Sequence, residues 1–277
     1  MLVNNEGSIA DYIHGRRTIT NRGLPVICIP TTAGTGSEVT AAAVTTDRES
    51  KEKIGLSHEY LIPAFALVDP QLHLSMPPSV TAATGIDALT HAIEAYIAVK
   101  ATPLSDALAL QAIELIGANL RQAYANGNDR EARSNMAIAS LIAGGAFANA
   151  GLGAVHGIAH PIGARFKVPH GVANAIMLPY VMEYCLIANY PKFRRIAVAL
   201  GENVNGLTDR EAAGLAIAAI KNLNRDIDIP GSLRVVGVTA DDREAIVKDA
   251  ATYRLLPNSP RQLTIKDLDI IVGRALK

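Results

Sequence analysis

Two kinds of hydrophobic pattern follow one another along this chain of 277 residues. Between residues 25 and 69, apolar residues come in short runs that are rich in β-branched side chains and bounded by proline, glycine or charged turns. Such runs are typical of strands. From residue 79 onward, apolar residues recur at helical spacing in long stretches rich in alanine and leucine. The pattern therefore predicts a β-containing part over residues 1–78 and an all-helical part over residues 79–277.

The β-containing part is predicted to begin with a polar, irregular lead-in over residues 1–22. The run from Pro25 to Pro30 is interpreted as a buried strand, because prolines bound its β-branched residues. Further short strands are predicted at residues 39–46, 53–56 and 64–69.

Start and stop signals divide the helical part into segments. Ser79, Thr102 and the pair Asn128-Asp129 are predicted to cap helices that end near residues 99, 126 and 150. No helix is predicted from 151 to 169. Later helices are predicted at 170–188, 191–200, 208–225, 240–252 and 264–276.

Composition narrows the class of protein. The chain has 26 basic and 26 acidic residues and no run of Lys or Arg, which argues against nucleic acid or an anionic membrane surface as a partner. Its two cysteines, far apart in apolar settings, indicate buried thiols in a reducing compartment. No apolar run is interpreted as long enough to span a membrane, and the N-terminus lacks the pattern of a signal peptide. We therefore expect a soluble cytoplasmic protein.

Histidines gather around one aspartate in the helical part. Asp87 and His91 are four residues apart in a predicted helix, so their side chains leave the same face. His156, His160 and His170 follow within 15 residues of one another. A lone histidine usually has an ordinary hydrogen-bonding role, but four of them with an in-phase aspartate favour a divalent-metal site. Spacing does not separate His156 from His160, which are also four apart.

A loop rich in glycine and hydroxyl side chains, Thr31–Glu38, follows the first predicted strand directly. Backbone N–H groups and hydroxyls in such a loop are suited to phosphates or ribose. The loop matches neither G-x-G-x-x-G nor G-x-x-x-x-G-K-[ST], so a plain tight loop is the alternative interpretation.

Four segments carry a family resemblance in the order in which they occur: Pro30–Glu38, Ala83–Tyr96, Gly153–Gly163 and Pro169–Asn174. With a looser likeness at Asn258–Thr264, the chain resembles the iron-containing (group III) alcohol dehydrogenase family over essentially its whole length, in particular its lactaldehyde reductase and 1,3-propanediol dehydrogenase branch. The resemblance implies an α/β remnant of a dinucleotide-binding domain over residues 1–78, followed by an all-α metal-binding catalytic domain over residues 79–277.

The resemblance also implies roles for single residues. It gives the metal, Fe(II) with Zn(II) as a substitute, four ligands: Asp87, His91, His156 and His170. It places the non-ligand His160 near the reacting carbon as the catalytic histidine. It favours NAD(H) over NADP(H), held near Thr31, Thr32, Thr35, Ser37 and Lys53. Glu94, less than a turn beyond His91, is interpreted as a carboxylate that supports a ligand or simply faces solvent.

The implied activity is hydride transfer between NAD(P)(H) and a small aliphatic alcohol or aldehyde, by a homo-oligomer with helical surfaces rich in Ala and Leu. Family members carry an upstream βαβ unit with a Gly-Gly-Gly-Ser loop that grips the pyrophosphate, and this sequence has no counterpart of it. We therefore expect exposed strand edges or apolar faces within residues 25–69, and weakened dinucleotide binding. The alternatives are a catalytically impaired, truncated metal-binding fragment, or a related metal-dependent lyase or hydrolase.

Overall fold

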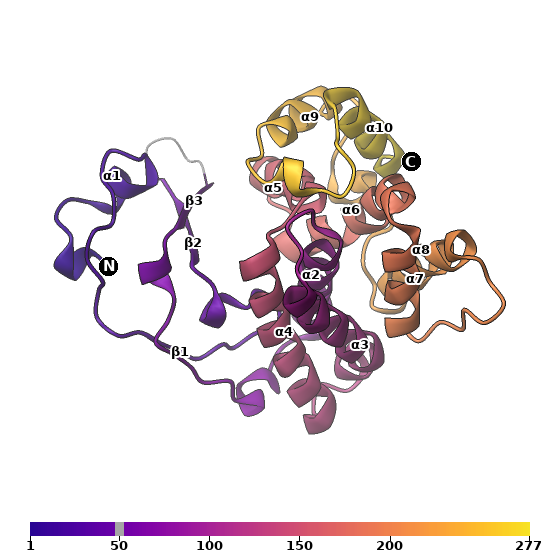
Figure 1. Cartoon of the computed structure of the whole chain (residues 1–277), viewed down its shortest axis with the longest axis horizontal. Helices are drawn as coiled ribbons and strands as arrows, with labels where there is room; N and C mark the ends of the chain where they lie inside the picture. The colour runs from indigo at the N-terminus through magenta and orange to yellow at the C-terminus, as the bar shows by residue number, and fades with distance from the viewer. Residues whose placement is uncertain (48–52) are drawn as a thin grey trace.

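The computed structural model describes residues 1–47 and 53–277. Figure 1 shows short strands on one side of a larger body of helices, with the N-terminus at the far end of the strand-containing part. That part holds one short α-helix and, in chain order, the strands β1 to β4: α1 (Ile9–Ile13), β1 (Ile27–Cys28), β2 (Ala42–Thr46), β3 (Lys53–Ser57) and β4 (Phe65–Ala66). The predicted irregular lead-in thus contains α1, which the reciprocal side-chain and backbone contacts of Ser8 and Asp11 cap.

The strands described here form two separate pairs. β1 runs parallel to β4, with Ile27 opposite Phe65, and β2 runs antiparallel to β3. The prediction of a buried strand between Pro25 and Pro30 was wrong, because Ile27 is 62% exposed and its neighbour Phe65 is 64% exposed. A parallel pair is normally buried by helices on both faces. Among residues 1–47 and 53–277, nothing covers these side chains, which confirms the expectation of exposed apolar faces in this part.

The helical body holds the hydrophobic core. Its helices are α2 (Pro78–Ile97), α3 (Pro103–Ala125), α4 (Arg130–Ala150), α5 (Ala154–Phe166), α6 (His170–Cys185), α7 (Tyr190–Ala199), α8 (Asp209–Asp226), α9 (Arg243–Ala251) and α10 (Ile265–Ala275). The 3₁₀ turns are Leu2–Asn4, Ser37–Val39, Glu59–Leu61, Pro70–His73, Leu186–Ala188, Leu233–Val236 and Leu256–Asn258.

Helix α2 lies at the centre of this body and packs against α3, α4 and α6. Every residue from Gly85 to Ile97 is buried, as expected of a helix that is apolar on most sides. Its polar residues in that stretch are therefore surrounded by protein and need partners. Helix α2 begins at Pro78, next to the predicted boundary between residues 78 and 79, with proline at the first helical position. The predicted cap, Ser79, lies inside the helix.

The remaining cap predictions agree with the structure. The side chain of Thr102 accepts a hydrogen bond from the N–H of Ser105, at 3.2 Å. Asp129 accepts one from the N–H of Ala132, at 3.0 Å. These side chains satisfy N–H groups that the first turn of a helix leaves without partners.

Sequence analysis missed helix α5, which carries His156 and His160. The helix contains Pro161, whose ring nitrogen has no hydrogen to donate to the carbonyl of Gly157. The helix forms nonetheless, because its residues from Ala154 to Ala159 are all buried against neighbouring helices. Helices α4 and α5 meet at 109° across the break at residues 151–153, which turns α5 toward α2.

Within the described residues, one helix qualifies by length and composition as a membrane span, contrary to the prediction that no apolar run is long enough, and α4 and α5 pass the test only as a pair bent by 109°. The single qualifying helix comprises α6 and the turn after it, His170–Ala188, and 61% of its residues are buried inside the protein. The core helix of a soluble protein passes the same test, and this helix packs against α2, α5 and α8.

Candidate metal centre

Three helices meet at the predicted metal site. Helix α2 supplies Asp87 and His91 one turn apart, α5 supplies His156, and α6 begins with His170. The first turn of α6 comes very close to α2, since a Cβ atom on Gly171 would lie 2.0 Å from the carbonyl oxygen of Ala83. Glycine at this position therefore allows the contact that places His170 beside Asp87.

The candidate ligand atoms of Asp87, His156 and His170 lie within 4.8 Å of one another. Asp87 Oδ1 is 3.7 Å from His170 Nε2 and 3.9 Å from His156 Nε2. His91 borders this group without joining it: its Nε2 is 3.1 Å from His156 Nε2, and its Nδ1 is 4.0 Å from Asp87 Oδ2.

Hydrogen-bond partners fix the tautomers of two imidazoles. His91 Nδ1 lies 3.2 Å from the carbonyl oxygen of Gly34, which only accepts, so Nδ1 is the donor. His156 Nδ1 lies 2.5 Å from Oε2 of Glu94 and donates to it when Glu94 is ionised, and burial raises the pKa of the Glu94 carboxyl group to about 7. Burial lowers the pKa of His156 well below its ordinary value, so this ring is neutral at pH 7. The Nε2 atom of the neutral His156 ring therefore carries a lone pair, and it faces Nε2 of His91.

Asn174 is the polar side chain at the centre of these acceptors, and sequence analysis assigned it no role. Its Nδ2 donates to Asp87 Oδ1 at 2.7 Å and lies 3.1 Å from the Nε2 atoms of both His156 and His170. Its own Oδ1 is buried and has no hydrogen-bond partner within the described part of the chain. This one amide nitrogen therefore makes three close polar contacts with only two hydrogens.

These residues fit a divalent cation. One carboxylate oxygen with imidazole nitrogens is a donor set that binds Fe(II) or Zn(II). More polar atoms converge here than the amide of Asn174 has hydrogens to satisfy, and a cation would resolve this arrangement. Burial disfavours the charge of Asp87, but the adjacent imidazoles and the amide of Asn174 outweigh burial and lower the pKa of its carboxyl group. The aspartate therefore remains ionised.

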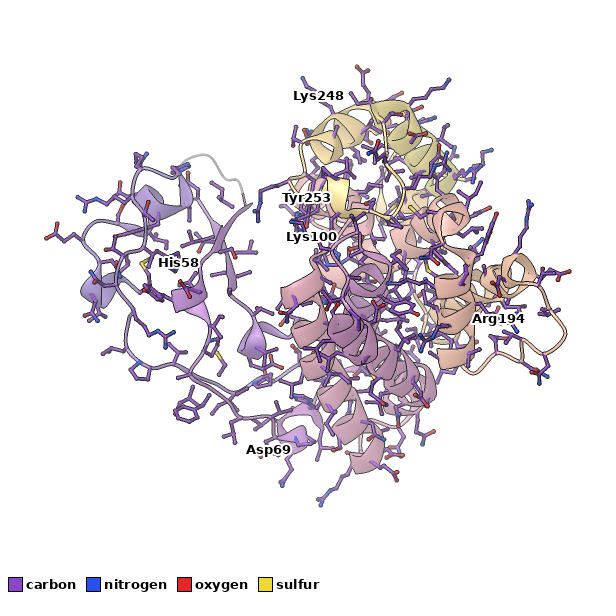
Figure 2. All side chains as sticks on the ribbon, in the orientation of Figure 1. His58, Asp69, Lys100, Arg194, Lys248 and Tyr253 are labelled. Atoms are coloured by element: carbon purple, nitrogen blue, oxygen red, sulfur yellow. The ribbon has the colours of Figure 1, made fainter. Side chains whose placement is uncertain are left out.

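His160 lies one helical turn beyond His156, on the solvent side of the ligand group. The residue is exposed, and its ring centroid is 5.4 Å from that of His170 and 6.2 Å from that of His156. The ring of Tyr253 meets His160 edge-on with centroids 5.2 Å apart. Figure 2 shows Tyr253 on the side of the helical body that faces the strands. Burial distinguishes the two histidines: His156 is enclosed beside Asp87 and His170, and His160 stands at the rim of this group.

Two glycines allow the loop Thr31–Glu38 to pack closely against the helices. A Cβ atom on Gly34 would lie 2.7 Å from Thr84 Cβ of α2, and one on Gly36 would lie 2.5 Å from Gly144 Cα of α4. Gly36 also has a left-handed φ of 57°. The loop presents hydroxyls to solvent, because Thr31, Thr35 and Ser37 are exposed and Thr32 is half-buried. The backbone of Lys53 belongs to β3, but its side chain lies outside the described structure.

Comparison with known proteins places the chain in a family. Residues 81–276 match the Fe-containing alcohol dehydrogenase family, C-terminal, and residues 1–70 match iron-containing alcohol dehydrogenase. The chain is 46% identical to long-chain-alcohol dehydrogenase 1 of Geobacillus thermodenitrificans over 99% of its own length and 70% of that protein. It is 44% identical to NAD-dependent methanol dehydrogenase of Bacillus methanolicus over 98% of its length and 71% of that protein.

A solved structure agrees with these relatives. The crystal structure of a 1,3-propanediol oxidoreductase superposes with a TM-score of 0.96 at 45% identity, and the match covers 99% of this chain and 72% of that one. The family resemblance and the fold class predicted from the sequence are thereby confirmed. The chain belongs to the iron-containing alcohol dehydrogenase family.

Proposed function

We propose that this chain forms the metal-binding catalytic part of an NAD-dependent dehydrogenase that interconverts small aliphatic alcohols and aldehydes. The observation that carries the proposal is the convergence of the Asp87 carboxylate with imidazole lone pairs around a single buried amide. NAD(H) rather than NADP(H) is supported by the relative named as an NAD-dependent methanol dehydrogenase. The substrate class is supported by relatives named for long-chain alcohols and methanol.

The proposed metal ligands are Asp87, His156 and His170, together with His91, whose Nε2 lies beside this group, 3.1 Å from His156 Nε2. A divalent cation bound there supplies a Lewis acid for the alcohol or carbonyl oxygen, and the nicotinamide supplies or accepts the hydride. The chain's own contribution is to hold the ligand atoms in place. Burial of Asp87 and His156 excludes water on one side, whereas His170, with 41% of its side chain exposed, leaves the other side open to a substrate.

His160 is the proposed catalytic histidine. It stands between the proposed ligands and solvent, so it can exchange protons with water. Its ring centroid is 5.4 Å from that of the proposed ligand His170. A histidine in that position is suited to carry the alcohol's proton to solvent, or to orient the hydroxyl that bears it. Both roles require the ring of His160. Retention of the cation does not depend on this ring, which distinguishes His160 from the proposed ligands.

The proposed dinucleotide contacts are the hydroxyls of Thr31, Thr32, Thr35 and Ser37, with Lys53 near the adenosine half. The exposed hydroxyls of this loop lie on a backbone that packs closely against α2 and α4 at the two glycines. This arrangement would hold phosphate and ribose oxygens at a fixed distance from the metal centre, because the Gly34 carbonyl contacts His91 directly.

We also propose a homo-oligomer in the cytoplasm, with neither nucleic acid nor a membrane as partner. Exposed apolar residues on the helical body, such as Val99 and Leu104, support association between copies. Two free thiols, Cys28 and Cys185, suit a reducing compartment. Balanced charge gives no basic surface for nucleic acid.

The decisive experiment measures metal content and NADH binding on the same protein. The purified chain is expected to retain Fe or Zn near one ion per chain, and Asp87→Ala is expected to lose it. NADH fluorescence that rises on binding, together with oxidation of NADH that depends on an added aldehyde, would support the dehydrogenase. Metal retention with no NADH binding would instead support the metal-binding fragment, and unchanged metal content in Asp87→Ala would refute the ligand assignment.

A further inference from the structure

We propose that Glu94 is the positioning residue of the metal centre: its carboxylate sets the tautomer and direction of the His156 ring and also caps the helix that carries this ring. The inference rests on the proposed function in one respect, namely that His156 binds the metal through Nε2. Helix α2 would then supply two proposed ligands, Asp87 and His91, and also the residue that positions His156.

The two oxygens of the Glu94 carboxylate contact adjacent residues of α5. Oε2 accepts from His156 Nδ1 at 2.5 Å, and Oε1 accepts from the backbone N–H of Val155 at 2.7 Å. Glu94 is 4% exposed and His156 is 1% exposed, so water does not compete for these bonds. A carboxylate that makes two hydrogen bonds to neighbouring residues has little freedom to rotate. It therefore also restricts rotation of the His156 ring.

The same carboxylate takes the place of an ordinary N-cap side chain. Helix α5 begins at Ala154, and the preceding residue, Gly153, has no side chain to satisfy the first N–H groups. Negative charge is favourable at that end of a helix. A Cβ atom on Gly153 would lie 3.2 Å from Glu94 Oε1, so a residue with its own side chain would crowd the carboxylate. The capping group therefore comes from α2.

Fixing the tautomer has a direct chemical consequence. With its proton on Nδ1, His156 directs an Nε2 lone pair toward the ligand atoms of Asp87 and His170. With the proton on Nε2, the same ring cannot bind a cation at that atom. Groups that hold a metal-binding imidazole from behind typically change metal affinity by about 10- to 100-fold.

Glu94→Gln is the sharpest test, because it preserves size and removes one acceptor. The backbone N–H groups of Gly153, Val155 and His156 face the side chain together with the His156 ring, whereas an amide offers one oxygen and one NH₂ group. The backbone N–H of Val155 cannot change, so the oxygen is expected to face it. The NH₂ group then faces His156 Nδ1, and the ring is expected to move its proton to Nε2.

Two measurements follow on the variant and on the wild type. Chelator competition with Zn²⁺ is expected to show affinity lowered by about 10- to 100-fold in Glu94→Gln. Ring ¹⁵N chemical shifts in the metal-free protein are expected to show the His156 proton on Nδ1 in the wild type and on Nε2 in the variant. Glu114→Gln, an exposed substitution on α3, is the matched control and should leave both readouts unchanged.

Glu94→Asp separates position from charge. It keeps the negative charge but is one methylene shorter, so it cannot reach both Val155 and His156, and we expect at least a tenfold loss of Zn²⁺ affinity. Affinity within twofold of wild type in either Glu94 variant, or a His156 proton that stays on Nδ1 in Glu94→Gln, would overturn the inference. Failure of the wild type itself to bind Zn²⁺ would overturn the proposed function as well, so the two failures are distinguishable.

Discussion

Replacing Asp87 by Asn should reduce the stability of the metal-bound protein far more than that of the metal-free protein. Asp87 is 4% exposed, and the direct donor to its Oδ1 is the amide of Asn174 at 2.7 Å. Without a cation, the adjacent imidazoles and this amide outweigh burial and keep the carboxyl group ionised. Asparagine has nearly the same shape and can accept the same hydrogen bond, so the metal-free variant should lose little stability.

The metal-bound protein should lose stability. A cation present at about 1,000 times its dissociation constant stabilises the wild type by about 4 kcal/mol. Removing the one anionic ligand should weaken binding at least as much as losing an outer partner does, about 100-fold. The same cation concentration is then about ten times the new dissociation constant, which corresponds to about 1.4 kcal/mol. For a chain of this size these values correspond to rises in melting temperature of about 8–16 °C and 3–6 °C.

The assay is calorimetry on chelator-treated protein with and without Zn²⁺, which avoids iron oxidation. Asp226→Asn, which removes one side of an exposed ion pair with Arg121, is a control of the same chemistry far from the site. It should leave the response to Zn²⁺ unchanged. If Asp87→Asn responded to Zn²⁺ as strongly as the wild type, the account of Asp87 as a metal ligand would be wrong.

Three further predictions test other parts of the structure. His160→Ala should lower kcat for alcohol oxidation by about 10²- to 10⁴-fold and leave Zn²⁺ affinity unchanged, and near-normal turnover would make it a packing residue. Gly171→Ala should destabilise the protein by about 1–3 kcal/mol in urea unfolding and weaken Zn²⁺ binding, because its Cβ would meet the carbonyl of Ala83. Hydrogen bonds from Tyr184 and from Thr264 lower the pKa of the Asp267 carboxyl group from 3.8 to about 2. This lowering stabilises the fold above about pH 4 and is lost as pH falls toward 2. Because the group is half-buried and solvent screens it in part, Asp267→Asn should cost at most about 1 kcal/mol at pH 6 and less at pH 3.

Local signals in the sequence predicted most of the helical part. Thr102, Asp129 and Thr264 cap α3, α4 and α10, because a side-chain oxygen at each position accepts from an N–H group of the first turn. Helix α5 was not predicted because Pro161 and the surrounding glycines oppose helix formation locally. Its stability comes from burial between α6 and α9, which depends on the fold as a whole.

The candidate site was predictable to the extent that it follows helical periodicity. Asp87 and His91 share one face of α2, which spacing alone indicates. The separation of His156 from His160 depends on the 109° angle between α4 and α5, and no local pattern encodes this angle. Asn174 was missed because an amide in a helix has no distinctive spacing. Its significance appears only when three helices bring acceptors to it.

Two of the imidazoles are oriented by groups outside their own helices, and this arrangement connects the two parts of the chain. Glu94 of α2 holds His156 of α5, and the Gly34 carbonyl of the hydroxyl-rich loop holds His91 of α2. His91 is also stacked on Phe147 of α4, with ring centroids 4.5 Å apart. A shift of the loop away from α2 would remove the acceptor that fixes the His91 tautomer. The loop proposed to bind the dinucleotide therefore also supports the proposed metal centre. A change in the position of the loop should alter the orientation of His91, and a change at His91 should alter the loop.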